Sequence, residues 1–149
     1  MTSAARLEKP ISLIKGVNPK VRPSVYVVFT SIDWTLKALE KARELAKPLD
    51  ANIVVVAAQV IPFPLPLDRP PVPMEFIVKR FEERSNEFPE RTRVIAYLCR
   101  NPLEALKHIL HRNSPVVIGI RKRWWPTHEK KLAQKLRSAG YPVSLVETE

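Results

Sequence analysis

Five short runs of apolar, β-prone residues recur along this chain and alternate with segments that have helical periodicity. The runs are nearly continuous in apolar residues, which is typical of strands buried on both faces of a parallel sheet. A β-α-β-α-β-α-β-α-β order predicts an α/β fold: a doubly wound, five-stranded parallel sheet with helices on both faces. We expect the strands over residues 24–30, 52–61, 93–98, 115–120 and 142–146.

Local signals place the helices between these strands. Ser31 or Asp33 offers a side-chain oxygen to cap the first helix, and Pro48 is expected to end it at about Lys47. Asn101 is a cap residue followed by a proline, which is typical of a helix start. We expect the remaining helices over residues 74–88, 101–111 and 127–139.

The length of 149 residues fits one domain, which we expect over residues 23–149. Residues 1–22 carry five basic side chains against Glu8 alone, and we interpret them as a flexible basic arm. That arm could be an electrostatic tether or a solvated tail. The proline-rich segment 61–73 cannot be helix or central strand, so it is either a stiff surface crossover or a polyproline II ligand.

Composition limits the function classes. Lys and Arg total 25 and Asp and Glu total 15, and this net charge of +10 favours an anionic partner: nucleic acid, an anionic membrane or a phosphorylated ligand. No stretch approaches the ~20 apolar residues of a membrane span, and we see no signal peptide. Cys99 is the single cysteine, so no internal disulfide can form, and we expect a cytoplasmic protein.

Chemistry-bearing motifs are scarce. With three glycines, the chain has neither a GxGxxG nor a GxxxxGK[ST] phosphate loop, and GxSxG is absent. The three histidines, His108, His111 and His128, show no recognisable metal-ligand spacing with carboxylates. We therefore predict no enzyme, no metal and no cofactor.

The stretch after Gly119 is the most informative one. It leaves a predicted strand at the edge where such sheets bind ligands, carries Arg121, Lys122 and Arg123, and enters a helix at Thr127. Basic side chains beside a helix N-terminus form an anion site in outline. Trp124 and Trp125 could stack on a base; alternatively they pack within the protein and the basic residues are solvated.

Several motifs follow one another in order: 27–31, Ala-Leu-Glu-Lys-Ala at 38–42, 59–62, 100–102, Val-Ile-Gly at 117–119 and Pro-Val-Ser-Leu-Val at 142–146. These motifs and the order of elements resemble the universal stress protein family over residues 23–147. The resemblance implies a Rossmann-like fold, a stress-response or regulatory role, and a homodimer that pairs through the final strand, here Tyr141–Glu147. An arm folded over that strand, through residues 10–14, would instead keep the chain monomeric.

The chain departs from the family's ATP-binding branch, in which Gly-x-x-Gly precedes a further glycine. Lys122 stands at the second glycine, Lys130 and Lys131 lie near the last one, and Thr30 replaces the strand-end Asp. Side chains of this size cannot wrap backbone amides around a triphosphate as glycines do. The resemblance therefore implies a non-catalytic module with weak or no ATP binding.

Two alternatives remain open. Basic side chains could replace the glycine amides in a binder of adenine nucleotides or other phosphorylated ligands, or the basic arm and the Trp-Trp loop could bind nucleic acid. The candidate ligand-binding residues are Thr30, Ser31, Val60, Gly119, Arg121, Lys122, Arg123, Thr127 and Lys130.

Overall fold

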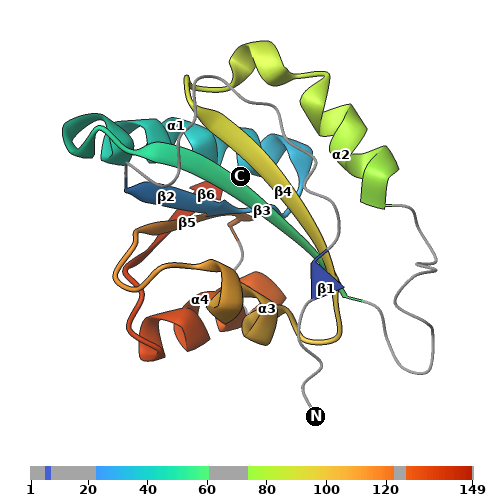
Figure 1. Ribbon diagram of the computed structural model, residues 1–149, viewed down its shortest axis with the longest axis vertical. Coiled ribbons are helices and arrows are strands. Elements are labelled where there is room, and N and C mark those ends of the chain that lie inside the picture. Colours follow the sequence, from blue (N-terminus) through green and yellow to red (C-terminus); the bar gives the residue numbers. More distant parts are fainter. Residues whose placement is uncertain (1–5, 8–22, 61–73, 123–126, 149) are drawn as a thin grey trace.

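The computed structural model describes residues 6–7, 23–60, 74–122 and 127–148. They form one sheet of order β1-β4-β3-β2-β5-β6, with helices above and below it (Figure 1). Five strands are parallel, so the predicted doubly wound sheet is confirmed. These strands are β2 (Ser24–Val28), β3 (Asn52–Val60), β4 (Thr92–Cys99), β5 (Val116–Arg121) and β6 (Val143–Thr148).

A sixth strand was not expected. β1 (Arg6–Leu7) pairs antiparallel with β4, so that Arg6 is opposite Leu98 and Leu7 opposite Tyr97. Two residues are too few to produce a recognisable strand pattern, and the pairing depends on an edge supplied by a distant segment. β1 lies at the edge of the sheet opposite β6. The rest of the arm, including residues 10–14, and the proline-rich segment 61–73 lie outside the described residues.

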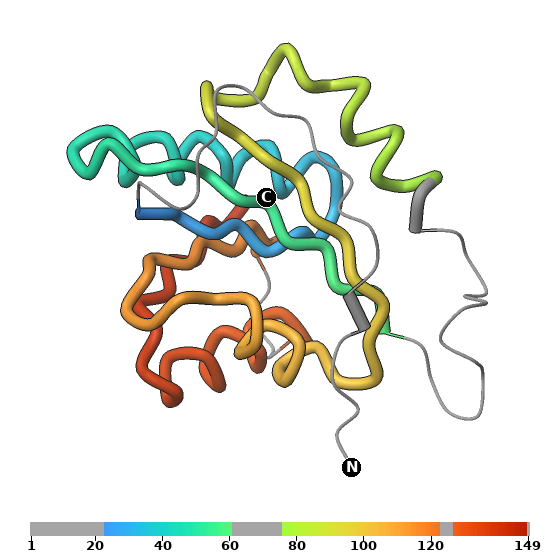
Figure 2. The backbone as a smooth tube through the Cα atoms, in the orientation of Figure 1, coloured from blue at the N-terminus to red at the C-terminus, as the bar shows by residue number. Residues whose placement is uncertain are grey.

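The helices α1 (Ile32–Leu49), α2 (Met74–Glu82), α3 (Pro102–Ile109) and α4 (His128–Ser138) follow the predicted order. The tube in Figure 2 shows how each one returns the chain to the sheet. Two predicted boundaries were wrong. α1 continues through Pro48 to Leu49, and its C-cap residue, Asp50, takes a left-handed conformation at φ 50°. A proline this close to the C-terminal end of a helix removes one helical hydrogen bond without stopping the last turn.

The helix predicted over 74–88 instead breaks after Glu82, and a short 3₁₀ helix, η1, spans Ser85–Glu87. The break allows Phe88 to turn back onto Phe81, with ring centroids 4.7 Å apart. The free energy gained by burying both rings exceeds the free energy lost by interrupting the helix, because helical stability in proteins comes mostly from tertiary packing.

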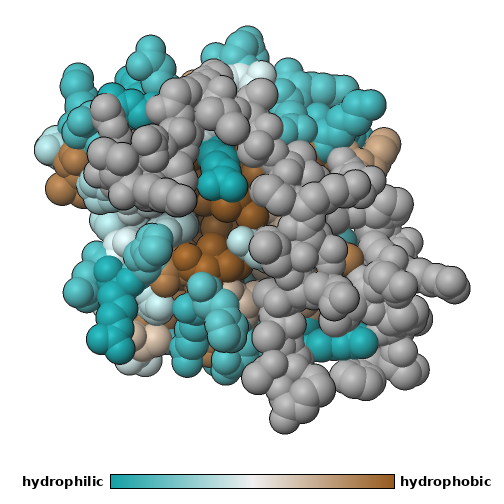
Figure 3. All heavy atoms as spheres, viewed as in Figure 1, coloured by the Kyte–Doolittle hydropathy of each residue, from teal (hydrophilic) through white to brown (hydrophobic). Residues whose placement is uncertain are grey.

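The sheet separates two hydrophobic cores. α1 and α2 cover one face, which we call the α1 face, and α3 and α4 cover the other, the α3/α4 face (Figure 1). Seen from the side in Figure 3, hydrophobic residues lie at the level of the sheet between the hydrophilic surfaces of the two helical layers. None of the helices in the described ranges combines the length and apolar character needed to cross a membrane.

Candidate functional site

A cavity of about 350 Å³ opens on the α3/α4 face, at the carboxyl ends of the strands. Its position follows from the topology: the chain winds from β2 outward to β4 and then returns to β5 on the other side of β2. Doubly wound sheets bind ligands where the winding reverses. Both strands at this switch point line the cavity, β2 through Val28 and β5 through Ile118.

Thr30 lines the cavity just beyond β2. Its Oγ1 donates a hydrogen bond of 2.6 Å to the carbonyl oxygen of Gly119, and its N–H donates to Thr35 Oγ1 at 3.1 Å. These bonds tie the exits of β2 and β5 together and fix the mouth of the cavity. Because the hydroxyl proton is committed to Gly119, Thr30 Oγ1 is left to act toward a ligand as an acceptor.

Packing requires a residue without a side chain at position 119. A Cβ on this residue would lie 2.1 Å from the carbonyl oxygen of Trp34 and 3.2 Å from the Ala38 Cβ. Only a glycine allows α1 to approach β5 this closely. The residue therefore has a structural role on the α1 face, while its carbonyl oxygen holds Thr30.

The cationic side chains of the cavity come from two separate segments. Arg100 follows β4, and Lys131 and Lys135 lie one turn apart on α4. Asn101, before α3, and His128 and Glu129, at the start of α4, also line the cavity. The sequence prediction missed Arg100, Lys131 and Lys135. Arg100 could have been found, because it follows a strand at the ligand-binding edge.

The basic residues predicted after Gly119 lie elsewhere. Along β5, alternate side chains point to opposite faces of the sheet. Ile118 lines the cavity, whereas Val117 belongs to the core of the α1 face, so Arg121, four residues after Val117, lies on the α1 face. The sheet therefore separates Arg121 from the cavity. The backbone N–H of Lys122 donates to the carbonyl oxygen of Thr148 at 2.6 Å. Arg123, with the two adjacent tryptophans, lies outside the described residues.

The remaining predicted residues are not part of the cavity lining. Ser31 caps α1 by accepting a 3.2 Å hydrogen bond from the Trp34 N–H, and Thr127 caps α4 by accepting from the Lys130 N–H. The ammonium group of Lys130 lies 4.0 Å from a carboxylate oxygen of Glu147 on β6. Val60 is exposed at the end of β3. Of the nine predicted residues, Thr30 alone is among the described residues that line the cavity.

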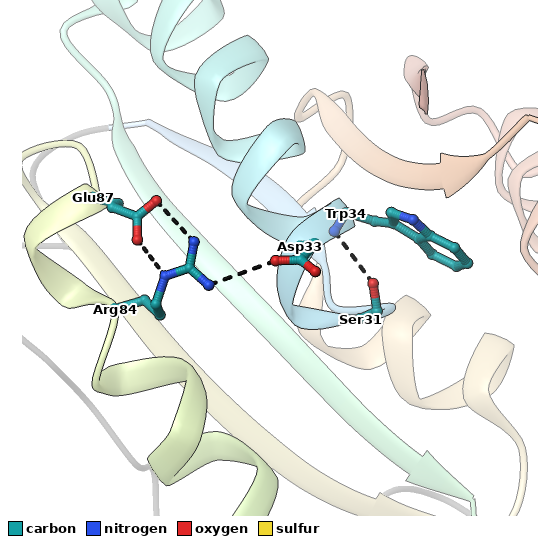
Figure 4. A network of polar contacts seen from close by, with 5 residues as sticks. All are labelled: Ser31, Asp33, Trp34, Arg84 and Glu87. Carbon is teal, nitrogen blue, oxygen red and sulfur yellow. Dashed lines mark hydrogen bonds and ion pairs between the residues drawn. The ribbon is translucent and has the colours of Figure 1, made fainter. Parts of the chain in front are cut away.

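An ion-pair network ties the start of α1 to the segment after α2 (Figure 4). Arg84 forms a bidentate contact with Glu87 and lies 3.5 Å from an Asp33 carboxylate oxygen. The hydrogen bond from the Arg84 guanidinium lowers the pKa of Glu87. In Figure 4 this network and the Ser31 cap lie on opposite sides of the first turn of α1. The first turn of α1 is therefore held by two independent sets of contacts.

Cys99 ends β4 and is fully buried. Burial raises the pKa of its thiol to about 11, so the sulfur stays protonated at neutral pH and is a poor nucleophile. Within the described part of the chain, no three His, Cys, Asp or Glu side chains are grouped so that they could hold a metal ion.

Comparison with solved structures identifies the fold. A universal stress protein in complex with cAMP is 14% identical, with a TM-score of 0.56, over 86% of this chain and 98% of that one. A universal stress protein from Archaeoglobus fulgidus is 16% identical, with a TM-score of 0.59, over 83% of this chain and 93% of that one. No family model and no curated protein matches the sequence. The chain therefore has the fold of the universal stress proteins.

Proposed function

We propose that this protein is a non-catalytic regulatory module of the stress-response type, which senses a small anionic ligand in the carboxyl-edge cavity. The observation that carries the proposal is the cavity at the topological switch point, lined by Arg100, Lys131 and Lys135. Among its described lining residues there is no cysteine, serine or aspartate, and Glu129 is the one carboxylate. The Thr30 hydroxyl, which also lines the cavity, donates its proton to the Gly119 carbonyl oxygen and not to a base, and this supports binding rather than hydrolysis.

Weak ATP binding is part of the proposal. The Lys122 N–H, at the position of the second glycine in the ATP-binding branch, is hydrogen-bonded to Thr148. Thr30 stands where that branch has a carboxylate, and its proton is directed to Gly119. We expect a dissociation constant for Mg-ATP no tighter than roughly 1 mM, about −4 kcal/mol.

A second candidate is an adenine-nucleotide binder that uses basic side chains in place of glycine amides. Its support is the same trio of cations, together with the cAMP complex of a protein with this fold. Isothermal titration with ATP, ADP, AMP and cAMP separates the candidates. Micromolar binding of Mg-ATP would overturn the first candidate and support the second, whereas binding of a smaller anion alone would support the first.

We also propose a homodimer that pairs through Tyr141–Glu147. β6 is the last strand of the sheet, and its partner is β5 on one side. An edge strand offers unpaired N–H and C=O groups that a second copy can satisfy in an isologous contact. Sedimentation at micromolar concentration tests this. A monomer of 17.1 kDa that persists after deletion of residues 1–20 would exclude the dimer.

A further inference from the structure

We propose that a groove between α1 and the segment 86–91 binds the C-terminus of a peptide that carries a basic residue shortly before its last residue. The groove lies on the α1 face, near the amino ends of β3 and β4, and we call it the α1 groove. It shares no lining residue with the carboxyl-edge cavity, so the inference does not depend on the ligand of that cavity.

The α1 groove consists of two adjoining cavities. One, of about 600 Å³, lies beside the C-terminal part of α1, and the other, of about 480 Å³, lies beside the middle of that helix. They share Arg43, Phe88 and Pro89 as lining residues. α1 lines the groove from Glu40 to Asp50, which is roughly 15 Å of helix. This elongated shape fits an extended peptide.

The end of the α1 groove near Asp50 is suited to a carboxylate. Arg43 and Lys47 are one turn apart on α1 and line this end, and no ion pair within the described residues involves either of them. Arg91 is the third cation, and its guanidinium lies 2.8 Å from an Asp50 carboxylate oxygen. With Glu90, three cations meet two carboxylates, which leaves one positive charge for a monoanion such as a peptide C-terminus.

The floor of the same cavity is apolar. Ala46, Ala51, Ile53 and Phe88 are buried beneath the exposed cations of α1, and Pro89 is half-buried beside them. The last residue of a peptide carries its carboxylate and its side chain on one Cα atom. An apolar last residue can therefore contact this floor while its carboxylate meets the cations.

The backbone at this end supports a role beyond stability. Asp50 and Arg91 both take the left-handed conformation, at φ 50° and φ 61°, which costs a non-glycine residue free energy. The ion pair between them is partly exposed, and such pairs return little stability. Glycine at either position would avoid the cost. The retention of two charged side chains here supports a contact with a ligand.

The other end of the α1 groove carries the opposite charge. Glu40 and Glu44, one turn apart on α1, line this end together with Glu87, and Arg43 is the one cation among its described lining residues. Because Glu87 is paired with Arg84, the two glutamates of α1 are left to meet a cationic side chain of the ligand.

The distance between the two ends sets the position of the basic residue in the peptide. Asp50 and Glu44 are six residues apart, which is roughly 9 Å along α1. An extended peptide covers about 3.3 Å per residue, so its basic residue would stand about three positions before the last one.

The test is fluorescence anisotropy of the full chain with the peptide Gly-Gly-Lys-Ala-Ala-Leu, which carries an uncharged fluorophore at its N-terminus. This peptide has no net charge, so the +10 charge of the protein does not attract it. We expect it to bind at least about fivefold more tightly than the same peptide with a C-terminal amide, which lacks the carboxylate. Equal affinity for the two peptides, or no binding of the acid peptide, would overturn the inference.

A competition experiment distinguishes a peptide from a free acid. The unlabelled peptide should displace the labelled one at a concentration at least about tenfold lower than N-acetylleucine does, since N-acetylleucine lacks the basic residue. Equal potency would assign the groove to a free carboxylic acid and overturn the inference.

Matched variants then locate the carboxylate. Arg43→Gln with Lys47→Gln should weaken binding of the acid peptide at least about fivefold, since both cations at that end are lost. Lys37→Gln with Lys41→Gln removes the same charge from positions on α1 that line neither cavity, and it should change binding less than about twofold. Thermal unfolding checks that both double variants are folded. Equal effects of the two would contradict the assignment.

An exchange of charges fixes the direction of the peptide. Glu40→Lys with Glu44→Lys should weaken binding of the lysine peptide at least about fivefold, and a peptide with Glu in place of Lys should recover that loss in a double-mutant cycle. Asp50→Asn keeps a residue that tolerates the left-handed conformation and removes a carboxylate from the basic end, so it should tighten binding about threefold. A cycle without coupling, or weaker binding to Asp50→Asn, would overturn the proposed orientation.

Discussion

The two faces of the sheet are built in opposite ways. On the α1 face one long helix presents Ala38, Ala42 and Ala46 to the strands and comes so close that β5 must carry a glycine. On the α3/α4 face two shorter helices leave an open cavity of about 350 Å³ at the carboxyl edge. Close packing where α1 meets β5 supplies rigidity, and looser packing of the other face at the carboxyl edge leaves room for a ligand.

The largest expected effect tests the packing of the α1 face. Phe81 is fully buried between Phe29 and Phe88, with ring centroids 5.2 and 4.7 Å away. Phe81→Ala should lower the free energy of unfolding by about 4 kcal/mol, measured by urea denaturation. Phe76, on the same helix, is 60% exposed, and Phe76→Ala should cost less than about 0.5 kcal/mol. If the two variants lost similar amounts of unfolding free energy, the α1 face would not be tightly packed around Phe81.

The next effect tests the approach of α1 to β5. Gly119→Ala places a Cβ 2.1 Å from a backbone oxygen, so the helix must move. We expect a loss of about 3 kcal/mol in unfolding free energy, at the upper end of overpacking costs. A loss below about 1 kcal/mol would show that α1 can shift freely, and the contrast between the faces would fail.

A pH experiment tests whether the α3/α4 face is dry beside its cavity. The buried Cys99 thiol has a pKa of about 11 in the folded chain, against an ordinary value of 9.0. Between these pH values it stays protonated in the folded chain, while an unfolded chain loses the proton. Ionisation therefore favours the unfolded chain, and stability falls as pH rises from 9 to 11. The wild type should lose roughly 2 kcal/mol over this range relative to Cys99→Ala.

The Cys99→Ala reference removes the effects of the tyrosines, since burial also raises the pKa of Tyr26 and Tyr97. The measurement is urea unfolding of both proteins at a series of pH values. A constant difference between them would mean that water reaches the thiol and that this part of the face is wet.

The smallest effect is on the cavity itself. Ala58 is half-buried and lines the cavity from β3. Ala58→Val should change the unfolding free energy by less than about 1 kcal/mol, because the added methyl groups enter open space, and it should weaken binding of the proposed anionic ligand. A loss as large as that of Gly119→Ala would show that the α3/α4 face is packed as tightly as the α1 face.

Much of the fold could be predicted because its signals are local. The apolar runs mark the parallel strands, and Ser31, Asn101 and Thr127 cap their helices through side chains that need a few neighbouring residues alone. The break after Glu82 could not be predicted, because it depends on the contact between Phe81 and Phe88 within a packed core.

The candidate site was harder to predict because distant residues make it. Gly119 looks like part of a phosphate loop, yet its requirement for glycine comes from Trp34, far away in the sequence. Arg100 and Lys135 meet only when β4 and α4 are packed against the same face. The order of the strands in the sheet determines that these two residues lie close together, and the charge composition of the chain cannot predict it.

The antiparallel pairing of β1 with β4 has a consequence for assembly. A sheet with two open edges can add copies at both and grow into a fibre. Here a strand of the chain itself already occupies the Tyr97–Leu98 end of one edge, and it runs against the direction of its neighbours. A newcomer at that edge would have to displace it, whereas no strand of the described residues pairs with the outer side of β6. Two copies joined through β6 would use up each other's accessible edge, and growth would stop at a pair.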